Sequence, residues 1–302
     1  HRPRRSRCYA RDGSARGLRQ QPRLDRAPNL RRDMGLRGPG IDDHAAAGLA
    51  RRELLRALVS RDLRTRYAGS AAGMLWAVVG PLLQIAILTT VFSMVLRVRF
   101  GEDARVPFAI ALAWGLFPWI AFQEGVARAT TALVDNGVLV KRMAFPPEVV
   151  LTQPALAAAV QLLVALGLLL LVMPAFGVVP APTAPLCVLP LLLLVALATG
   201  IGWILGVLHV YLRDTAQVVV AALQAWFYLT PIVYSADSAP PGLRGLLSLN
   251  PLAGIIEGFR AFALGGPVPW EALAWSAIAA IGALLAGAAA VSRARDELAD
   301  LV

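Results

Sequence analysis

The chain has 302 residues, of which 57% are hydrophobic and only 16% are charged, whereas an average soluble domain is about 45–50% apolar and about 25% charged. Its mean hydropathy is +0.62. This composition argues against a soluble globular enzyme. It also excludes intrinsic disorder over most of the length, because disordered chains combine low hydrophobicity with high net charge. We therefore expect an all-α integral membrane protein.

The net charge of +10 is concentrated at the N-terminus. Residues 1–33 contain eleven arginines and three aspartates, a net charge of +8, and the remaining 269 residues carry +2. An arginine-rich arm can bind nucleic acid, but this one lacks heptads, interleaved aromatic residues and zinc-ligand spacing. We therefore interpret residues 1–40 as a disordered tail, or as a mis-called start before Met34, and residues 41–302 as the membrane domain.

An amphipathic helix is predicted over about residues 48–67. Leucine and valine recur there at four-residue spacings, from Leu54 and Leu55 to Leu63, while arginines such as Arg56 take the other side. A helix with one apolar and one basic face is suited to a membrane surface. This helix leads directly into the first predicted span.

Six membrane spans follow from the gaps between charged residues, because a membrane helix needs about 20 mostly apolar residues. Four gaps hold one helix each. The 64 uncharged residues between Glu148 and Arg213 hold two helices, separated by prolines from Pro174 to Pro185 that break helices. The predicted spans are about 72–96, 106–126, 150–173, 185–211, 215–235 and 271–292.

Lysines and arginines flank the two ends of these spans unequally. Eleven lie on the side of the amphipathic helix and of the connection 134–149, and five lie on the other side. Positive residues accumulate in cytoplasmic loops, so we expect both termini in the cytoplasm and the protein in the cytoplasmic (inner or plasma) membrane. The outer stretch 235–269 contains two apolar runs too short to cross, and we expect re-entrant helices there, between spans five and six.

Catalysis by this chain is poorly supported. The three histidines lack partners for metal or triad chemistry, and the two cysteines form neither a disulfide framework nor a CxxC site. We therefore expect no metal site and no cofactor. A P-loop requires a Gly-Lys step, and the single lysine, Lys141, follows Val140. Any ATP hydrolysis must come from a partner.

Two spacings within the spans predict helix packing. Glu124 and Arg128 can pair across one helical turn, and we favour a structural ion pair over a gating role. Gly202 and Gly206 form a GxxxG, which suits close approach of a neighbouring helix.

Aromatic residues are crowded in the second and fifth predicted spans. Aromatic faces can stack on the apolar edges of sugar rings, so they are candidates for lining a substrate channel. Ordinary packing in the core and in the membrane's aromatic belt is an equal alternative. The channel candidates are Trp76, Trp114, Phe117, Trp119, Trp226, Phe227, Tyr228 and Tyr234.

Four blocks of sequence carry a family resemblance. They are RDLRTRYAGSAAGMLWAVVGP (61–81), LVKRMAFPPEV (139–149), LTPIVYS (229–235) and NPLAGIIEGFRAF (250–262). With these blocks in this order, the chain resembles the permease subunit of type-2 ABC exporters for cell-surface polysaccharides, the O-antigen and teichoic-acid exporter family. The resemblance runs from about Leu54 to the C-terminus.

The resemblance implies a homodimeric pore bound to two copies of a separate ATP-hydrolysing subunit. It implies that residues 54–67 form the interface helix and 136–145 the coupling helix, both of which contact that subunit. Ala68 and Pro147 depart from the family, which often has basic residues there, and this leaves the contacts with the subunit open. The implied coupling residues are Arg61, Arg64, Arg66, Asn136, Lys141 and Arg142.

By the same resemblance, residues 246–262 form paired re-entrant helices that close the pore exit, with Asn250, Pro251, Glu257 and Arg260 as the site residues. We therefore expect a channel that moves a polyprenyl-linked polysaccharide (O-antigen, teichoic acid or a related cell-wall glycan) outward, with no nucleic-acid partner. A type-2 ABC exporter of drugs or lipids is the closest alternative. A membrane-embedded glycosyl- or prenyltransferase would require acidic clusters on a cytoplasmic loop, which the sequence lacks.

Overall fold

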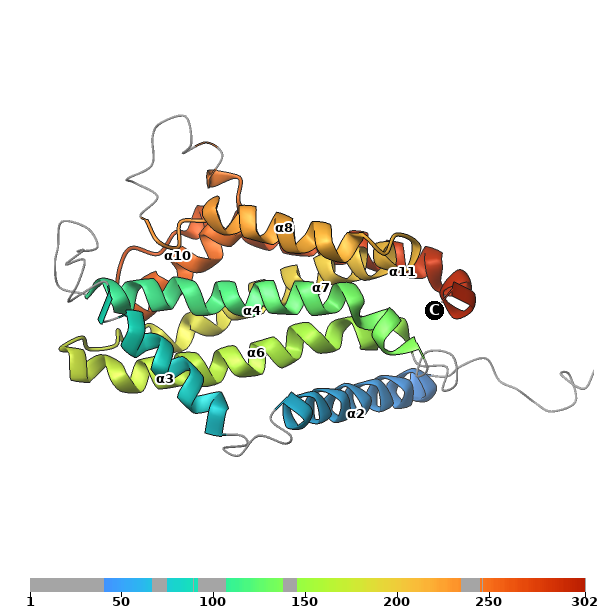
Figure 1. Cartoon of the computed structure of the whole chain (residues 1–302), viewed down its shortest axis with the longest axis horizontal. Coiled ribbons are helices and arrows are strands. Elements are labelled where there is room, and N and C mark those ends of the chain that lie inside the picture. Colours follow the sequence, from blue (N-terminus) through green and yellow to red (C-terminus); the bar gives the residue numbers. More distant parts are fainter. Residues whose placement is uncertain are drawn as a thin grey trace, which may run out of the picture. The chain divides into compact units, whose positions relative to one another are not determined.

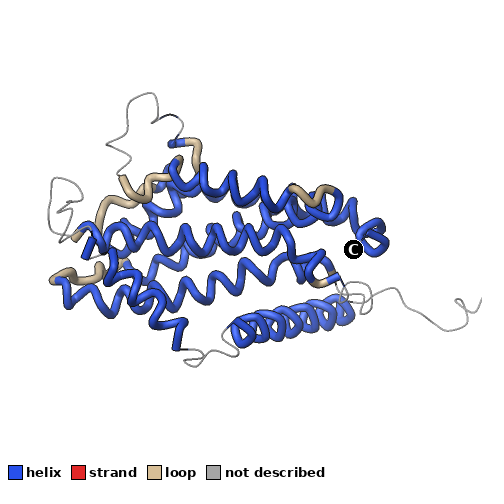
Figure 2. Tube along the Cα trace, in the orientation of Figure 1, coloured by secondary structure: helices blue, strands red, loops and turns tan. Residues whose placement is uncertain are grey.

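The computed structural model describes residues 41–66, 75–88, 90–91, 107–137, 146–234, 245 and 247–301. The chain divides into two units, His1–Ala47 and Gly48–Val302. Of the first unit, only residues 41–47, the start of one helix, are described. Every regular element in the described residues is a helix (Figure 2), which confirms the all-α prediction.

Eight α-helices make up the described part of the chain. They are α2 (Ile41–Arg66), α3 (Trp76–Leu88), α4 (Phe108–Asp135), α6 (Pro147–Val172), α7 (Val188–Tyr211), α8 (Thr215–Tyr228), α10 (Pro251–Leu264) and α11 (Trp270–Leu301). Two short 3₁₀ turns, η3 (Met173–Phe176) and η4 (Ala184–Cys187), extend α6 and α7 at the connection between them. The left-handed Gly177 ends η3 at this point, where the sequence predicts a proline- and glycine-rich break.

Four helices in the described residues are long and apolar enough to cross a membrane. They are Phe108–Asp135, Pro147–Phe176, Ala184–Tyr211 and Trp270–Arg295. These helices coincide with the second, third, fourth and sixth predicted spans. The chain is therefore a multi-pass membrane protein.

The fifth predicted span is shorter in the structure, and the first is described only in part. α3 and α8 have 13 and 14 residues, or about 20 Å of helix at 1.5 Å per residue. The remainder of the first predicted span, at 72–74, 89 and 92–96, lies outside the described residues. α8 ends three residues before Pro231, which has no N–H and whose ring would clash with the carbonyl of Phe227 in a regular continuing helix.

The predicted amphipathic helix is present as α2, which begins at Ile41, seven residues before the predicted start. Leu55, Val59 and Leu63 share one face of α2 and line a groove of about 520 Å³ together with residues of α6 and α7. Arg61 and Arg64 are exposed. Arg56, which the spacing places on the basic side, also lines this groove, so the apolar and basic sides are only partly separated.

α4 is the central helix of the second unit. It packs on both α6 and α7, and Figure 1 shows α4 and α6 running side by side. In α4, 78% of the most apolar stretch is buried, against 22% in α11. α11 packs mainly on α7. α7 therefore lies between α11 and most of α4.

Glycines allow α7 to approach both of its neighbours. A Cβ atom on Gly202 would lie 2.6 Å from the Cβ of Ala129 in α4, and one on Gly206 would lie 2.9 Å from the Ala129 carbonyl oxygen. This confirms the predicted packing role of the GxxxG. On the other side of α7, a Cβ on Gly200 would lie 2.7 Å from the carbonyl oxygen of Ala283 in α11.

Candidate functional site

Asn250 joins the end of α8 to the start of α10. Its Oδ1 accepts hydrogen bonds from the backbone N–H of Leu252 and from Nε1–H of Trp226, each at 3.0 Å. Its Nδ2 donates to the carbonyl of Leu229 at 3.0 Å and to Oγ1 of Thr230 at 2.9 Å. Asparagine is a preferred N-cap residue. This side chain therefore caps α10 and also satisfies a carbonyl that α8 leaves free at its end.

The N-terminus of α10 is also attached to α11. Pro251 is the first residue of α10, a position where a missing N–H costs nothing. Its carbonyl accepts a hydrogen bond from Oγ of the buried Ser276 at 2.7 Å. One turn away, Nε1–H of Trp275 donates to the Leu249 carbonyl at 2.9 Å. These bonds fix where α10 starts.

Arg260 attaches the same helix to α4 and to the turn that follows α8. Its Nε–H donates to the carbonyl of Ala111 at 3.0 Å, Nη1 to that of Pro231 at 2.9 Å, and Nη2 to that of Ile232 at 2.5 Å. Gly115 makes room for the guanidinium, because a Cβ there would lie 2.5 Å from Nη2. A single partly buried cation thus holds three elements together.

The predicted pore-exit residues therefore lie in α10 or at its N-cap, and they contact different parts of the chain. Asn250 and Arg260 bind the α8 end and its following turn from two points of α10. Glu257 lies one turn before Arg260 and attracts its charge. Sequence reasoning selected these residues, but their acceptor carbonyls carry no sequence signal because every residue has a carbonyl.

Four of the predicted channel aromatics form a cluster with Phe122 between α4 and α8: Trp119, Trp226, Phe227 and Tyr228. The ring of Trp119 lies 6.0 Å from that of Phe122 and 5.6 Å from that of Phe227. Phe122 packs edge-on against Trp226 at 5.5 Å, and Phe227 packs edge-on against Tyr228 at 5.3 Å. These distances and tilts are those of favourable aromatic pairs.

The predicted channel aromatics include both buried and exposed side chains. Trp114, Phe117 and Trp119 are buried in the core of the chain. Tyr228 is 76% exposed and Trp76 is 47% exposed. Trp226 and Phe227 lie between these extremes, and so does Tyr234, whose hydroxyl donates to the Tyr228 carbonyl at 3.1 Å. The exposed members are thus available to a ligand, and the buried ones support them.

A groove of about 380 Å³ runs between α4 and α8 beside this cluster. Its aromatic lining includes Phe227 and Tyr228, and its polar lining consists of Gln123 and Gln224. Oε1 of Gln123 accepts a hydrogen bond from Nε1–H of Trp119 at 2.9 Å, which leaves its amide N–H₂ free to turn toward the groove. Aromatic faces beside amide groups can bind a polar ring.

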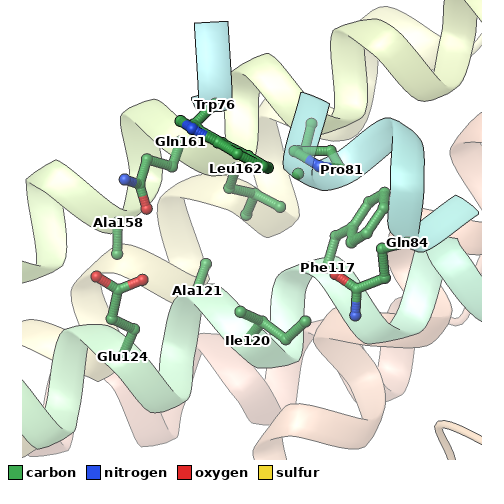
Figure 3. Close-up of a pocket in the computed structure, with 12 residues that line it drawn as sticks. Trp76, Pro81, Gln84, Phe117, Ile120, Ala121, Glu124, Ala158, Gln161 and Leu162 are labelled. Atoms are coloured by element: carbon green, nitrogen blue, oxygen red, sulfur yellow. The ribbon is translucent and has the colours of Figure 1, made fainter. Parts of the chain in front are cut away.

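A recess of about 280 Å³ lies where α3, α4 and α6 meet (Figure 3). It brings together two predicted channel residues, Trp76 and Phe117, with the side chains of Glu124, Gln84 and Gln161. Figure 3 shows the carboxylate of Glu124 and the amide of Gln161 facing each other at one end, with Gln84 beside Phe117 at the other. Sequence reasoning missed both glutamines.

Arg128 connects α4 to α2. It pairs with Glu124 at 3.4 Å, as the four-residue spacing predicts. Its closer partner is Asp62 of α2, which accepts from both Nη1 and Nη2. A two-point contact between guanidinium and carboxylate is stronger and more directional than a single one. The amphipathic helix is therefore held to the membrane domain by an ion pair that the sequence analysis did not identify.

The predicted coupling residues are only partly described. Asn136 follows α4 and its Nδ2 donates to the Ala132 carbonyl at 2.9 Å, which helps to end the helix. Arg66 is the last residue of α2. Lys141 and Arg142 lie outside the described residues.

Comparison with known proteins assigns the family. The sequence profile of ABC-2 type transporters matches residues 53–264, from the amphipathic helix to the end of α10. The chain belongs to the ABC-2 type transporter family.

Relatives of this ABC-2 family member cover most of its length. It is 29% identical over 257 residues to the O-antigen export system permease protein RfbA of Myxococcus xanthus, covering 83% of this chain and 96% of the relative. It is 27% identical to RfbA of Klebsiella pneumoniae over 72% of this chain and 83% of the relative. It is 26% identical to the polysialic acid transport protein KpsM of Escherichia coli over 70% of this chain and 81% of the relative.

These relatives are permease subunits, which are transport components rather than catalysts. The matched region contains both structural features described above: α2 with its ion pair to α4, and α10 with its attachments to the α8 end. The network around Asn250 and Arg260 therefore belongs to the transporter domain itself.

Proposed function

We propose that this protein is the membrane permease subunit of an ATP-driven exporter that moves a polyprenyl-linked polysaccharide across the cytoplasmic membrane. The similarity to O-antigen and polysialic acid transport proteins carries this proposal, because it extends over 70–83% of the chain. Two recesses lined by aromatic rings and amides support it, since both are suited to sugar rings.

The groove between α4 and α8 offers groups that match a glycan. The faces of Phe227 and Tyr228 can stack on the apolar edges of a sugar ring, and the amides of Gln123 and Gln224 can bond to its hydroxyls. Each contact should be weak, because a conducting pathway must release its substrate as readily as it binds it. Tyr228 is 76% exposed and is the most accessible aromatic side chain of this groove.

The exporter is proposed as a homodimer with six spans per subunit and two ATP-hydrolysing subunits. α3 and α8 have exposed apolar side chains, such as Leu83 and Val218, so a second copy of the chain is a suitable partner for these faces. α10 is proposed as a re-entrant helix at the pore exit, because its 14 residues extend about 21 Å and the hydrocarbon core is about 30 Å thick.

The ATP-hydrolysing subunit is proposed to bind at the cytoplasmic ends of α2 and α4, with both termini of the chain on that side. The exposed Arg61 and Arg64 of α2, together with Arg66, Asn136, Lys141 and Arg142, are the proposed contact residues. The ion pair between Arg128 and Asp62 would then transmit movement of α2 directly to α4.

Depletion of the protein in its native host tests the function. We expect lipid-linked glycan to accumulate inside the cell and surface glycan to decrease. The protein, tagged at its C-terminus and purified in mild detergent, should retain a P-loop subunit that mass spectrometry can identify. If depletion leaves lipid-linked glycan unchanged while the P-loop subunit still co-purifies, the substrate is a drug or a lipid instead. Failure to recover an ATPase in several detergents would overturn the exporter assignment.

Tyr228 provides a further test of the groove. Tyr228→Ala should slow export without loss of the ATPase subunit, because this exposed ring supports little of the core. Trp226→Ala is a weaker test, since Trp226 also donates a hydrogen bond to Asn250 and its loss would disturb α10. Unchanged export by Tyr228→Ala would contradict the proposed stacking role.

A further inference from the structure

The recess between α3, α4 and α6 is formed by one face of each helix. α3 contributes Trp76, Gly80 and Gln84 at four-residue spacings, and α4 contributes Phe117 and Glu124, two turns apart. Residues at these spacings lie on the same side of a helix. The residues that line the recess therefore come from one face of each of the three helices.

Polar side chains in this recess lie near the middle of two candidate spans. Glu124 is close to the centre of Phe108–Asp135, and Gln161 is close to the centre of Pro147–Phe176. Carboxylates and amides within a membrane-spanning helix are expensive unless they face water or a polar ligand, and an ionisable residue there is a functional candidate. The recess is open enough to leave the carboxyl side chain of Glu124 24% exposed.

We propose that this recess is a subsite for one uncharged sugar ring of the exported glycan, an inference that rests on the proposed function. The exposed indole of Trp76 supplies the stacking face, and Gln84, Gln161 and Glu124 supply acceptors and donors for hydroxyls. Its volume of about 280 Å³ lies at the lower limit of about 300–1,000 Å³ for pockets that hold whole drug-sized ligands. The recess therefore takes one ring.

The charge of the recess selects against acidic sugars. Glu124 is the charged residue among its lining residues. Its partner Arg128 lies 3.4 Å away and is bound more closely by Asp62. A carboxylate on the sugar would be repelled by the nearby carboxylate of Glu124. Neutral hexoses and N-acetylhexosamines fit, and uronic or sialic acids do not.

Filling the recess tests the subsite with little risk to the fold. A Cβ added at Gly80 meets no described atom within 4 Å, and replacing a helical glycine favours the helix. Gly80→Leu should lower the export rate about tenfold, as expected when a ring loses two hydrogen bonds. Gly167→Leu on α6 is the matched control, because its Cβ is also free of contacts and Gly167 does not line the recess.

Two further variants test the chemistry. The double variant Gln84→Leu and Gln161→Leu should reduce the export rate about as much as Gly80→Leu does. Gln153→Leu on α6, outside the recess, should leave the export rate unchanged. Glu124→Gln keeps a hydrogen-bonding group and should retain export within about threefold. Loss of export in Glu124→Gln would instead indicate a site for a cation and would overturn the neutral-sugar assignment.

The outcomes separate this proposal from the function on which it rests. If depletion of the wild-type chain fails to accumulate lipid-linked glycan, the proposed glycan-export function is wrong. If depletion does so and Gly80→Leu exports at the rate of Gly167→Leu, the subsite alone is wrong. Compositional analysis of the accumulated glycan provides the last test, because a chain built only of acidic sugars would contradict the charge selection.

Discussion

Replacing Arg260 by alanine should destabilise the protein, because it removes three hydrogen bonds that attach α10 to α4 and to the turn after α8. The side chain donates to three carbonyls, of which Ala111 and Ile232 belong to fully or nearly fully buried residues. A buried acceptor left without its donor costs about 1–3 kcal/mol. Because Arg260 is only partly buried and water can reach part of the space, we take the lower value for each bond and expect a loss of about 3 kcal/mol.

The change in unfolding temperature measures this loss. For a chain of this size, 1 kcal/mol corresponds to about 2–4 °C, so Arg260→Ala should unfold roughly 6–12 °C below the wild type in the same detergent. Arg260→Lys keeps the charge but loses the planar guanidinium that reaches three acceptors. Its unfolding temperature should therefore lie between those of the wild type and Arg260→Ala. Arg213→Ala, at an exposed arginine between α7 and α8, is the control and should change the midpoint by less than about 2 °C. An Arg260→Ala midpoint equal to that of the control would refute the reasoning.

A double-mutant cycle tests the geometry itself. Gly115→Ala places a Cβ 2.5 Å from Nη2 of Arg260 and should displace the guanidinium from its acceptors. On an Arg260→Ala background the same change should cost much less, because most of its clash is gone. Equal costs of Gly115→Ala in the two backgrounds would show that the guanidinium does not lie against α4.

Other predictions follow from single contacts. Asn250→Ala should lower stability by about 1–3 kcal/mol, because it removes the cap of α10 and leaves the α8 carbonyl unbonded; thermal unfolding measures it, and an unchanged midpoint would contradict the capping role. Gly200→Val should destabilise the contact between α7 and α11 by about 1–3 kcal/mol, while Gly282→Val, whose Cβ meets no described atom, should be far milder. Asp62→Asn should weaken the two-point contact with Arg128, so that limited proteolysis releases α2 sooner than in wild type at low salt; equal cleavage rates would count against this ion pair as the attachment of α2.

The class of fold and the positions of four membrane-length helices were predictable from the sequence. Apolar length and the placement of charges are local properties, and a helix satisfies its own backbone hydrogen bonds within the bilayer. The GxxxG at Gly202 and the four-residue spacing of Glu124 and Arg128 were predictable for the same reason, since spacing along one helix decides which side chains share a face.

The length of α8 was not predictable from a count of uncharged residues. The gap that suggested a span over 215–235 contains Pro231, and the helix ends at Tyr228. Proline in that context is compatible with a kinked span or with a helix end. The bonds from Asn250 and Arg260 to residues 229–232 accompany the helix end, and both donors come from a part of the chain 20 to 29 residues away.

An all-α membrane protein of the ABC-2 type could thus be predicted from composition, charge placement and motifs. The packing of the helices was needed to show that Trp119 is buried beneath the groove while Tyr228 faces outward, that Arg128 binds Asp62 more closely than Glu124, and that two glutamines join Trp76 in one recess. The physical reason is that these outcomes depend on how each helix is rotated against its neighbours. Rotation is set by packing between residues that are distant in the chain, such as the pair Arg128 and Asp62, 66 positions apart.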